Sequence, residues 1–130
     1  MNTLLSTVSS ARIARPTSSL ARVIAFYVRD LGFSDLGGFT DHNGYSGCFV
    51  GIDGASWHIE FTQHERHTPT PTVEDLLVLY MPRSSVEALT ARMTSAGHAA
   101  VVHPNPYWAD TAAITFVDDD GYPIVFCPED

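Results

Sequence analysis

The sequence predicts an α+β fold built from two similar halves. The motif PTSSL at residues 16–20 recurs as PRSSV at residues 82–86, after a shift of 66 residues. A short apolar strand precedes each copy, a helical pattern follows it, and each half ends in a strand introduced by an Asp-Gly pair. One motif can recur by chance, whereas the same order of elements around both copies indicates an internal repeat.

The first half reads as a strand, a helix and three further strands. A strand is expected at residues 12–15, and the helix is predicted by apolar side chains spaced along one helical face: Leu20, Val23, Ile24, Tyr27 and Leu31. Ser18 or Ser19 would cap that helix, and Gly32 would end it. The three strands are expected at residues 33–41, 45–51 and 57–61, with Asn43-Gly44 as the turn between the first two.

The second half repeats this order less clearly. A strand at residues 76–80 precedes a helix whose apolar face carries Val86, Leu89, Met93 and Ala96. Ser84 or Ser85 would cap the helix, and Gly97 would end it. Further strands are expected at residues 99–103, 112–117 and 122–127, with a loop at residues 104–111.

These elements predict one domain with a short leading segment. Residues 1–9 lack the basic start of a signal peptide and are expected to form a flexible N-terminal tail. The domain at residues 10–128 would consist of modules 10–64 and 73–128, joined by the Pro/Thr-rich linker 65–72. Each half alone could bury only one helix face, so the halves are expected to pair around a shared core.

Composition narrows the range of partners. The 130 residues carry 15 Asp and Glu against seven basic residues, all Arg, for a net charge of -8. This excess of negative charge argues against nucleic acid and leaves a neutral or cationic small molecule as the expected partner. No apolar run approaches the ~20 residues that span a membrane. Cys48 and Cys127 lie in apolar stretches, where buried free thiols and a cytoplasmic location are expected.

Two segments carry a family resemblance. SLARVIAFYVRDLGF at residues 19–33 resembles the first helix of the vicinal-oxygen-chelate superfamily, and FVDDDGYPIVF at residues 116–126 is similar to its closing hairpin. The superfamily includes glyoxalases, bleomycin-resistance proteins, fosfomycin-resistance enzymes and extradiol dioxygenases. Segments 12–17, 57–62 and 105–108 look like a glyoxalase-like branch of it. The resemblance implies two paired βαβββ modules that form a cupped sheet holding the site, the glyoxalase/bleomycin-resistance fold, and a homodimer.

The same resemblance bears on metal binding. Metal-dependent members carry one ligand on the first and one on the last strand of each module, and the corresponding positions here are Arg12, Glu60, Val78 and Val125. Only Glu60 offers a ligand atom, whereas a catalytic metal requires about three from the protein. The sequence therefore predicts no metal and no other cofactor.

Several side chains are candidates for a site in the cup. His58 and Glu60 alternate with apolar residues, so they share one face of a strand, either as a functional pair or as a solvated polar face. Arg12 is expected to reach Glu60, in a functional or a structural pair. Tyr80 lies two residues after Val78 on the same expected strand, so its side chain would point to the same face and place its hydroxyl in the cup. The predicted ligand-binding set is Arg12, His58, Glu60, Tyr80, Asn105, Tyr107 and Trp108.

The Asn105–Trp108 segment brings two adjacent aromatic rings into a loop. A ligand, a dimer partner or the protein's own core could cover such rings. We interpret the loop as a lid over the site.

Two function classes follow. The first is a metal-free, dimeric binding protein like the bleomycin-resistance members, with a small and cationic or amine-bearing ligand. The alternative is a metal-independent lyase, isomerase or hydrolase, with His58 or Glu60 as the base and Tyr80 as the acid. A metal-dependent glyoxalase or dioxygenase ranks third. At this point the sequence does not decide whether the protein is an enzyme, because one fold hosts many activities.

Overall fold

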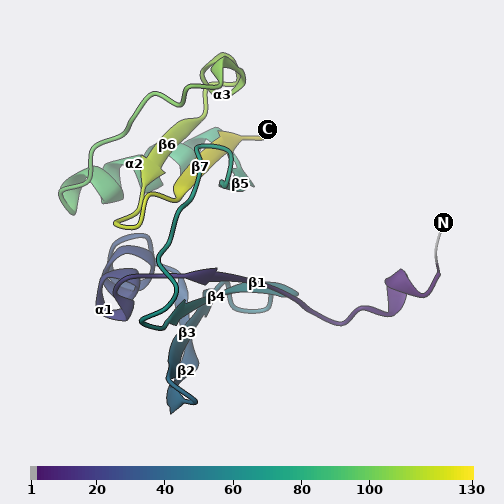
Figure 1. Cartoon of the computed structure of the whole chain (residues 1–130). Coiled ribbons are helices and arrows are strands. Elements are labelled where there is room, and N and C mark those ends of the chain that lie inside the picture. The colour runs from purple at the N-terminus through teal and green to yellow at the C-terminus, as the bar shows by residue number, and fades with distance from the viewer. Residues whose placement is uncertain (1–2) are drawn as a thin grey trace. The chain divides into compact units, whose positions relative to one another are not determined.

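The computed structural model describes residues 3–130, and the chain divides into two units that each contain a sheet. The first unit runs to Val28 and resumes from Gly32 to Thr68, and the second comprises Arg29–Leu31 and Pro69–Asp130. Helices and strands occur in both units (Figure 1), so the predicted α+β class is confirmed.

The sheet of the first unit has the strand order β1-β4-β3-β2 (Figure 1). Its strands are β1 (Ala11–Pro16), β2 (Ser34–His42), β3 (Tyr45–Gly51) and β4 (Trp57–Gln63). β1 and β4 are parallel, and the other neighbours are antiparallel. The predicted Asn43-Gly44 turn is confirmed, because both residues have the positive φ (54° and 87°) that a tight hairpin requires.

One face of this sheet packs against the helical segment that follows β1. Ile59 and Phe61 are almost fully buried there, and the Phe61 and Tyr27 rings lie 5.0 Å apart. Each such buried apolar side chain contributes about 1.5–3 kcal/mol through its removal from water. The opposite face of β4 therefore carries the alternate residues, among them His58 and Glu60.

The helical segment differs from the regular helix that the spacing predicts. It consists of α1 (Leu20–Val23) and a π-helical stretch, η2 (Ile24–Asp30). The Ser19 hydroxyl caps α1 by accepting a hydrogen bond from the Arg22 amide, as predicted. The wider π turn rotates the following side chains relative to an α-helix. Phe26, absent from the predicted apolar face, is buried next to Tyr27.

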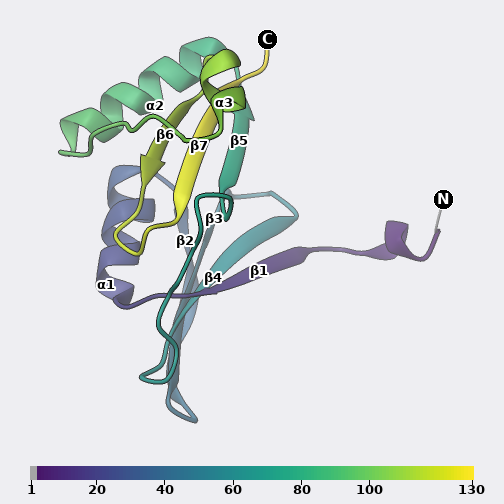
Figure 2. The ribbon, with the colours of Figure 1, turned by 45° about the horizontal axis from the view of Figure 1, so that its top comes forward.

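The second unit has a three-stranded sheet with the order β5-β7-β6. The strands are β5 (Leu77–Met81), β6 (Ile114–Val117) and β7 (Pro123–Pro128). The helix α2 (Arg83–Ser95) lies along this sheet (Figure 2). Val86 and Met93 of α2 are buried, as are Phe116, Ile124 and Phe126 of the sheet. In both units the first strand runs parallel to the last, whose other neighbour is antiparallel, so the predicted repeat extends to the strand topology.

Three details of the second unit correct the sequence prediction. The expected strand at residues 99–103 is reduced to one bridge between Val101 and Thr115. Side-chain bonds hold this segment instead, because His103 lies 2.7 Å from the Val73 oxygen and accepts from the Asn105 amide. The expected loop contains the helix α3 (Pro106–Asp110). Finally, α2 begins at Arg83, so Ser84 and Ser85 lie inside the helix and do not cap it.

The N-terminal prediction is tested only in part. Residues 1–2 of the predicted tail lie outside the described residues, and Leu5–Thr7 form a single 3-10 turn, η1. The segment before β1 is exposed and extends beyond the strand (Figures 1 and 2). Within the described residues, no helix is long and apolar enough to cross a membrane.

Candidate functional site

The open face of the first unit's sheet brings together three of the predicted site residues. The register pairs Arg12 of β1 with His58 of β4, and Phe49 of β3 with Glu60 of β4. Residues paired in this way, or two apart on one strand, project to the same face. Arg12, Phe49, His58 and Glu60 therefore form one cluster, which we call the Arg12 cluster.

The Arg12 guanidinium lies at the centre of this cluster. Its Nη1 donates to Glu60 Oε1 at 2.7 Å, and its Nε donates to His58 Nε2 at 3.1 Å. Its carbon lies 4.6 Å from the centre of the Phe49 ring, within cation-π range. Two hydrogen bonds and a ring face thus hold the guanidinium in one orientation.

The cluster exposes its cation more than its anion. The Glu60 side chain is 12% exposed, whereas the Arg12 side chain is 49% exposed. A carboxylate that is buried this far requires a partner, which Arg12 provides. His58 Nε2 accepts the hydrogen bond from Arg12 Nε, so this ring nitrogen is occupied by the guanidinium.

This geometry limits the acid-base chemistry that the cluster can perform. His58 Nε2 and Glu60 Oε1 both face Arg12 and accept its hydrogen bonds. A general base must instead reach the proton that it removes, directly or through one water. The arrangement is suited to holding a polar group and poorly suited to removing a proton from carbon.

The remaining predicted site residues lie in the second unit. Tyr80 on β5 is 56% exposed and lies two residues from Val78, so their side chains share a face of that sheet. Asn105 is the N-cap of α3, where its Oδ1 accepts from the Tyr107 amide at 3.1 Å. The Asn105 side-chain oxygen is thus engaged in the helix, and its predicted contact with a ligand is not tested.

The two aromatic rings of α3 differ in exposure. Tyr107 is exposed, whereas Trp108 is half-buried, and the rings meet edge to face at 5.0 Å. The Trp108 Nε1 atom is buried and has no hydrogen-bond acceptor among the described residues. Buried donors of this kind are rare in folded proteins.

The residues at the family's metal positions do not fit a metal ion. Arg12 is paired with Glu60 in the first unit, which places a cation where a metal would need a ligand. In the second unit, Val78 pairs with Val125 across β5 and β7, and neither has a ligand atom. Across residues 3–130, no group of three or more His, Cys, Asp or Glu could hold a metal ion. We therefore derive no chemical step from a metal.

Sequence reasoning missed a cluster around the buried Asp30 in the second unit. His98 Nε2 lies 2.7 Å from Asp30 Oδ2, and Arg29 Nε donates to Asp30 Oδ1 at 2.8 Å. The hydrogen bonds from Arg29 and His98 lower the pKa of Asp30 to about 2. Arg92 adds two bonds, to the Asp30 and Arg29 carbonyl oxygens. Arg92 and His98 follow Arg29 and Asp30 by more than 60 positions in the sequence, and no local motif predicts their contact.

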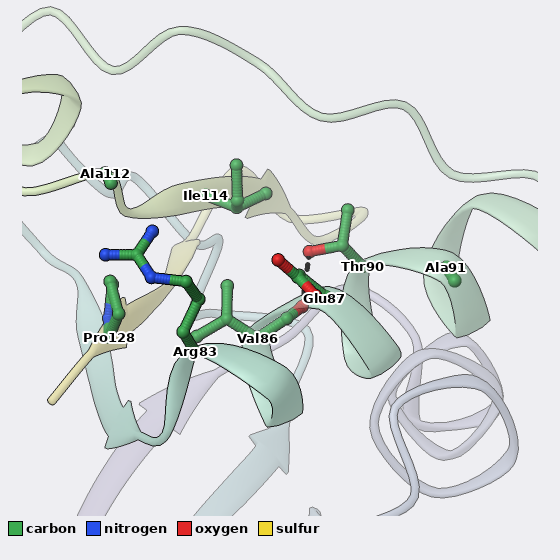
Figure 3. A pocket seen from close by; sticks show the side chains of 8 residues that line it. All are labelled: Arg83, Val86, Glu87, Thr90, Ala91, Ala112, Ile114 and Pro128. Atoms are coloured by element: carbon green, nitrogen blue, oxygen red, sulfur yellow. Dashed lines mark hydrogen bonds between the residues drawn. The ribbon is translucent and has the colours of Figure 1, made fainter. Parts of the chain in front are cut away.

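Two pockets are lined by residues outside the Arg12 cluster. One, of about 430 Å³, is bounded by α2 and by residues of β6 and β7 (Figure 3). Its lining is largely apolar, and the Thr90 hydroxyl donates to the Val86 oxygen of its own helix. The other, of about 380 Å³, lies in the first unit and is lined by Gln63, His64 and Glu65 among others.

Comparison with solved structures identifies the class of fold. An antibiotic-binding protein from Streptomyces sp. CB03234, TnmS3, aligns with a TM-score of 0.70 at 23% identity, over 93% of this chain and 95% of its own. A glyoxalase/bleomycin resistance protein from the same organism aligns with a TM-score of 0.66 at 25% identity, over 92% and 99%. The fold is therefore that of the glyoxalase/bleomycin-resistance class, as the sequence predicts.

A narrower relationship follows from the sequence. Residues 11–62 match the YycE-like N-terminal domain, and residues 74–127 match the YycE-like C-terminal domain. YycE of Bacillus subtilis (strain 168) is 41% identical over 118 residues, which cover 88% of this chain and 84% of YycE. The crystal structure of B. subtilis YycE aligns with a TM-score of 0.85 at 38% identity, over 95% of this chain and 91% of that chain. The chain belongs to the YycE-like family.

Proposed function

We propose that the protein binds a small organic molecule at the Arg12 cluster and does so without a catalytic metal. The observation that carries this proposal is the fixed guanidinium of Arg12, which is half-exposed between Glu60, His58 and Phe49. A preorganised polar group beside an aromatic ring is typical of small-molecule sites. The fold of TnmS3, which binds an antibiotic, supports the same class of function.

The alternative function, a metal-independent lyase, isomerase or hydrolase, receives less support. It requires His58 or Glu60 as a base, and both already accept hydrogen bonds from Arg12. It also requires Tyr80 as an acid, and no described contact prepares the Tyr80 hydroxyl for that role. We therefore favour binding without turnover.

Three further statements from the sequence stay proposals. Tyr80, Asn105, Tyr107 and Trp108 would add contacts to the ligand, and residues 10–128 would act as one domain. The chain would form a homodimer, the commonest oligomer of soluble proteins. A cytoplasmic location is supported by Cys48 and Cys127, which are both free and buried.

The test is a screen of small molecules by NMR on the labelled protein. We expect a binder to shift the amide resonances of Arg12, Phe49 and Glu60 and to be recovered chemically unchanged. The matched control is Arg83→Gln, which removes an exposed arginine whose ion pair with Asp130 is long, at 3.9 Å. Binders that shift resonances only elsewhere would contradict the location, and conversion of the binder would contradict binding without turnover.

A further inference from the structure

We infer that the Arg12 cluster binds an organic carboxylate with an apolar, planar frame and discriminates against cations. This inference rests on the proposed function and names the class of ligand. It opposes the cationic ligand that the net charge of -8 favours. The reason is local, because the charges that a ligand meets first belong to the site and not to the whole chain.

Arg12 has more hydrogen-bond donors than the cluster uses. A guanidinium has five N–H groups in a plane. One is used on His58 and one on Glu60. The other three have no acceptor among the described residues, and half of the side chain is exposed. Three N–H groups on a half-exposed side chain are therefore available to a ligand.

The hydrogen-bond acceptors of the cluster are already engaged by Arg12. Glu60 is the only carboxylate in the cluster, it is nearly buried, and its negative charge is already balanced by Arg12. The acceptor nitrogen of His58 is likewise engaged. An ammonium ligand would approach the exposed guanidinium, and the carboxylate that it needs is nearly buried and already paired with Arg12. A carboxylate would meet a positive charge and several N–H groups, the strong type of charge-assisted bond.

Apolar side chains lie near the Arg12 guanidinium. Phe49 covers one side of the guanidinium, and the Phe39 ring lies 6.0 Å from the Phe49 ring. Leu36, which is exposed, lies beside Gly51, the residue of β3 that pairs with His58. Both phenylalanines are half-buried, so apolar surface adjoins the donor group. A flat apolar frame attached to the carboxylate would cover this surface and remove it from water.

The experiment compares three ligands that share a naphthalene frame: 1-naphthoate, 1-naphthamide and 1-naphthylmethylammonium. Titrations are followed by NMR and by calorimetry at pH 7 and low salt. We expect the wild-type protein to bind the anion at least roughly tenfold more tightly than the cation, with the neutral amide between them. Arg12→Gln should weaken 1-naphthoate at least roughly tenfold, whereas Arg83→Gln should leave its affinity unchanged.

The outcomes distinguish the carboxylate inference from the proposed binding function on which it rests. Glu60→Gln removes a negative charge near the ligand, so 1-naphthoate should bind it as well as or better than it binds the wild type. Tighter binding of the cation at the Arg12 cluster would overturn the carboxylate inference and leave the binding function standing. Failure of all three ligands to shift the Arg12, Phe49 and Glu60 resonances at millimolar concentration would count against both. Circular dichroism on each variant confirms that it is folded.

Discussion

Arg12 and Glu60 form an ion pair of 2.7 Å although the register places them diagonally rather than opposite each other. β1 and β4 pair Arg12 with His58, and Ala14 with Glu60. The small Ala14 side chain leaves the guanidinium room to extend along the sheet toward Glu60. The same diagonal path places His58 within reach of Arg12 Nε at 3.1 Å. One arginine thus binds two residues of β4 and orders the open face of the sheet.

The first prediction is that Arg12 and Glu60 are energetically coupled. Arg12→Gln leaves the nearly buried Glu60 carboxylate without its counter-ion and should lower the free energy of unfolding by about 1–3 kcal/mol. Glu60→Gln should cost less, because an amide keeps the shape and tolerates the loss of charge. The double variant should cost less than the sum of the two. Urea unfolding of the four proteins provides the cycle. Additive effects would show that the pair contributes nothing as a pair.

The second prediction concerns pH and the Asp30 cluster. Hydrogen bonds from Arg29 and His98 lower the pKa of Asp30 to about 2, below its ordinary value of 3.8. A lowered pKa means that the ionised group stabilises the fold at pH values above 3.8. This contribution is lost as the pH falls from 3.8 to 2. We expect the free energy of unfolding to fall over this window in the wild type.

The matched variant for this prediction is Asp30→Asn. It cannot ionise, so its free energy of unfolding should be lower at neutral pH and should change less between pH 4 and pH 2. Urea titrations at several pH values measure both curves. Identical slopes for the two proteins in that window would contradict the role of Asp30.

The third prediction is that the protein requires no transition metal. Val78 and Val125 offer no ligand atoms, and Arg12 repels a cation at the position of a ligand. Treatment with a chelator should therefore leave the melting temperature unchanged, and added Zn²⁺ or Mn²⁺ should not raise it. Elemental analysis of the purified protein is the direct measurement. A stoichiometric metal that survives chelation and is lost in Glu60→Ala would contradict this expectation.

The fold was largely predictable because its signals are local or repeated. The motif at residues 16–20 and its copy, the Asn43-Gly44 turn and the helix-ending glycines Gly32 and Gly97 each act within a few residues. Both glycines have a φ of 98°, which favours a residue without a side chain. The π-helical stretch and α3 were missed because periodicity cannot show where a turn widens, and because a five-residue helix leaves no repeating pattern.

The predicted contact between Arg12 and Glu60 is confirmed, whereas the further geometry of the candidate site could not be predicted. Strand alternation places His58 and Glu60 on one face, but it does not show that Arg12 binds both and exposes its own donors. The net charge favours a cationic ligand, whereas the half-exposed guanidinium of Arg12 favours an anionic one in our inference, because an ion pair can change the charge of a site without changing that of the chain. The Asp30 and His98 contact joins residues 68 positions apart, and only tertiary packing brings them together.

The fourth prediction is that the chain is a homodimer in solution. β1 is an edge strand, and its Ile13 is 60% exposed, a combination that favours pairing with a second copy. Light scattering at micromolar concentration should give twice the mass of the chain. Ile13→Glu should shift the mass toward the monomer if β1 contributes to the interface. Val102→Glu, at a more exposed position outside the sheets, serves as the control. A monomeric wild type would contradict the prediction.

The last prediction uses the unpaired indole of Trp108. Its Nε1–H is buried and makes no hydrogen bond to the described residues, so we expect this donor to add little to the stability of the folded chain. Trp108→Phe removes the donor and keeps most of the apolar area, and the free energy of unfolding should stay within about 1 kcal/mol of the wild type or rise. Trp108→Ala removes the ring as well and should cost about 3 kcal/mol or more. Urea unfolding of the three proteins separates the two contributions. If the phenylalanine variant loses as much as the alanine variant, the N–H makes a bond that stabilises the native protein, and α3 does not lack an acceptor.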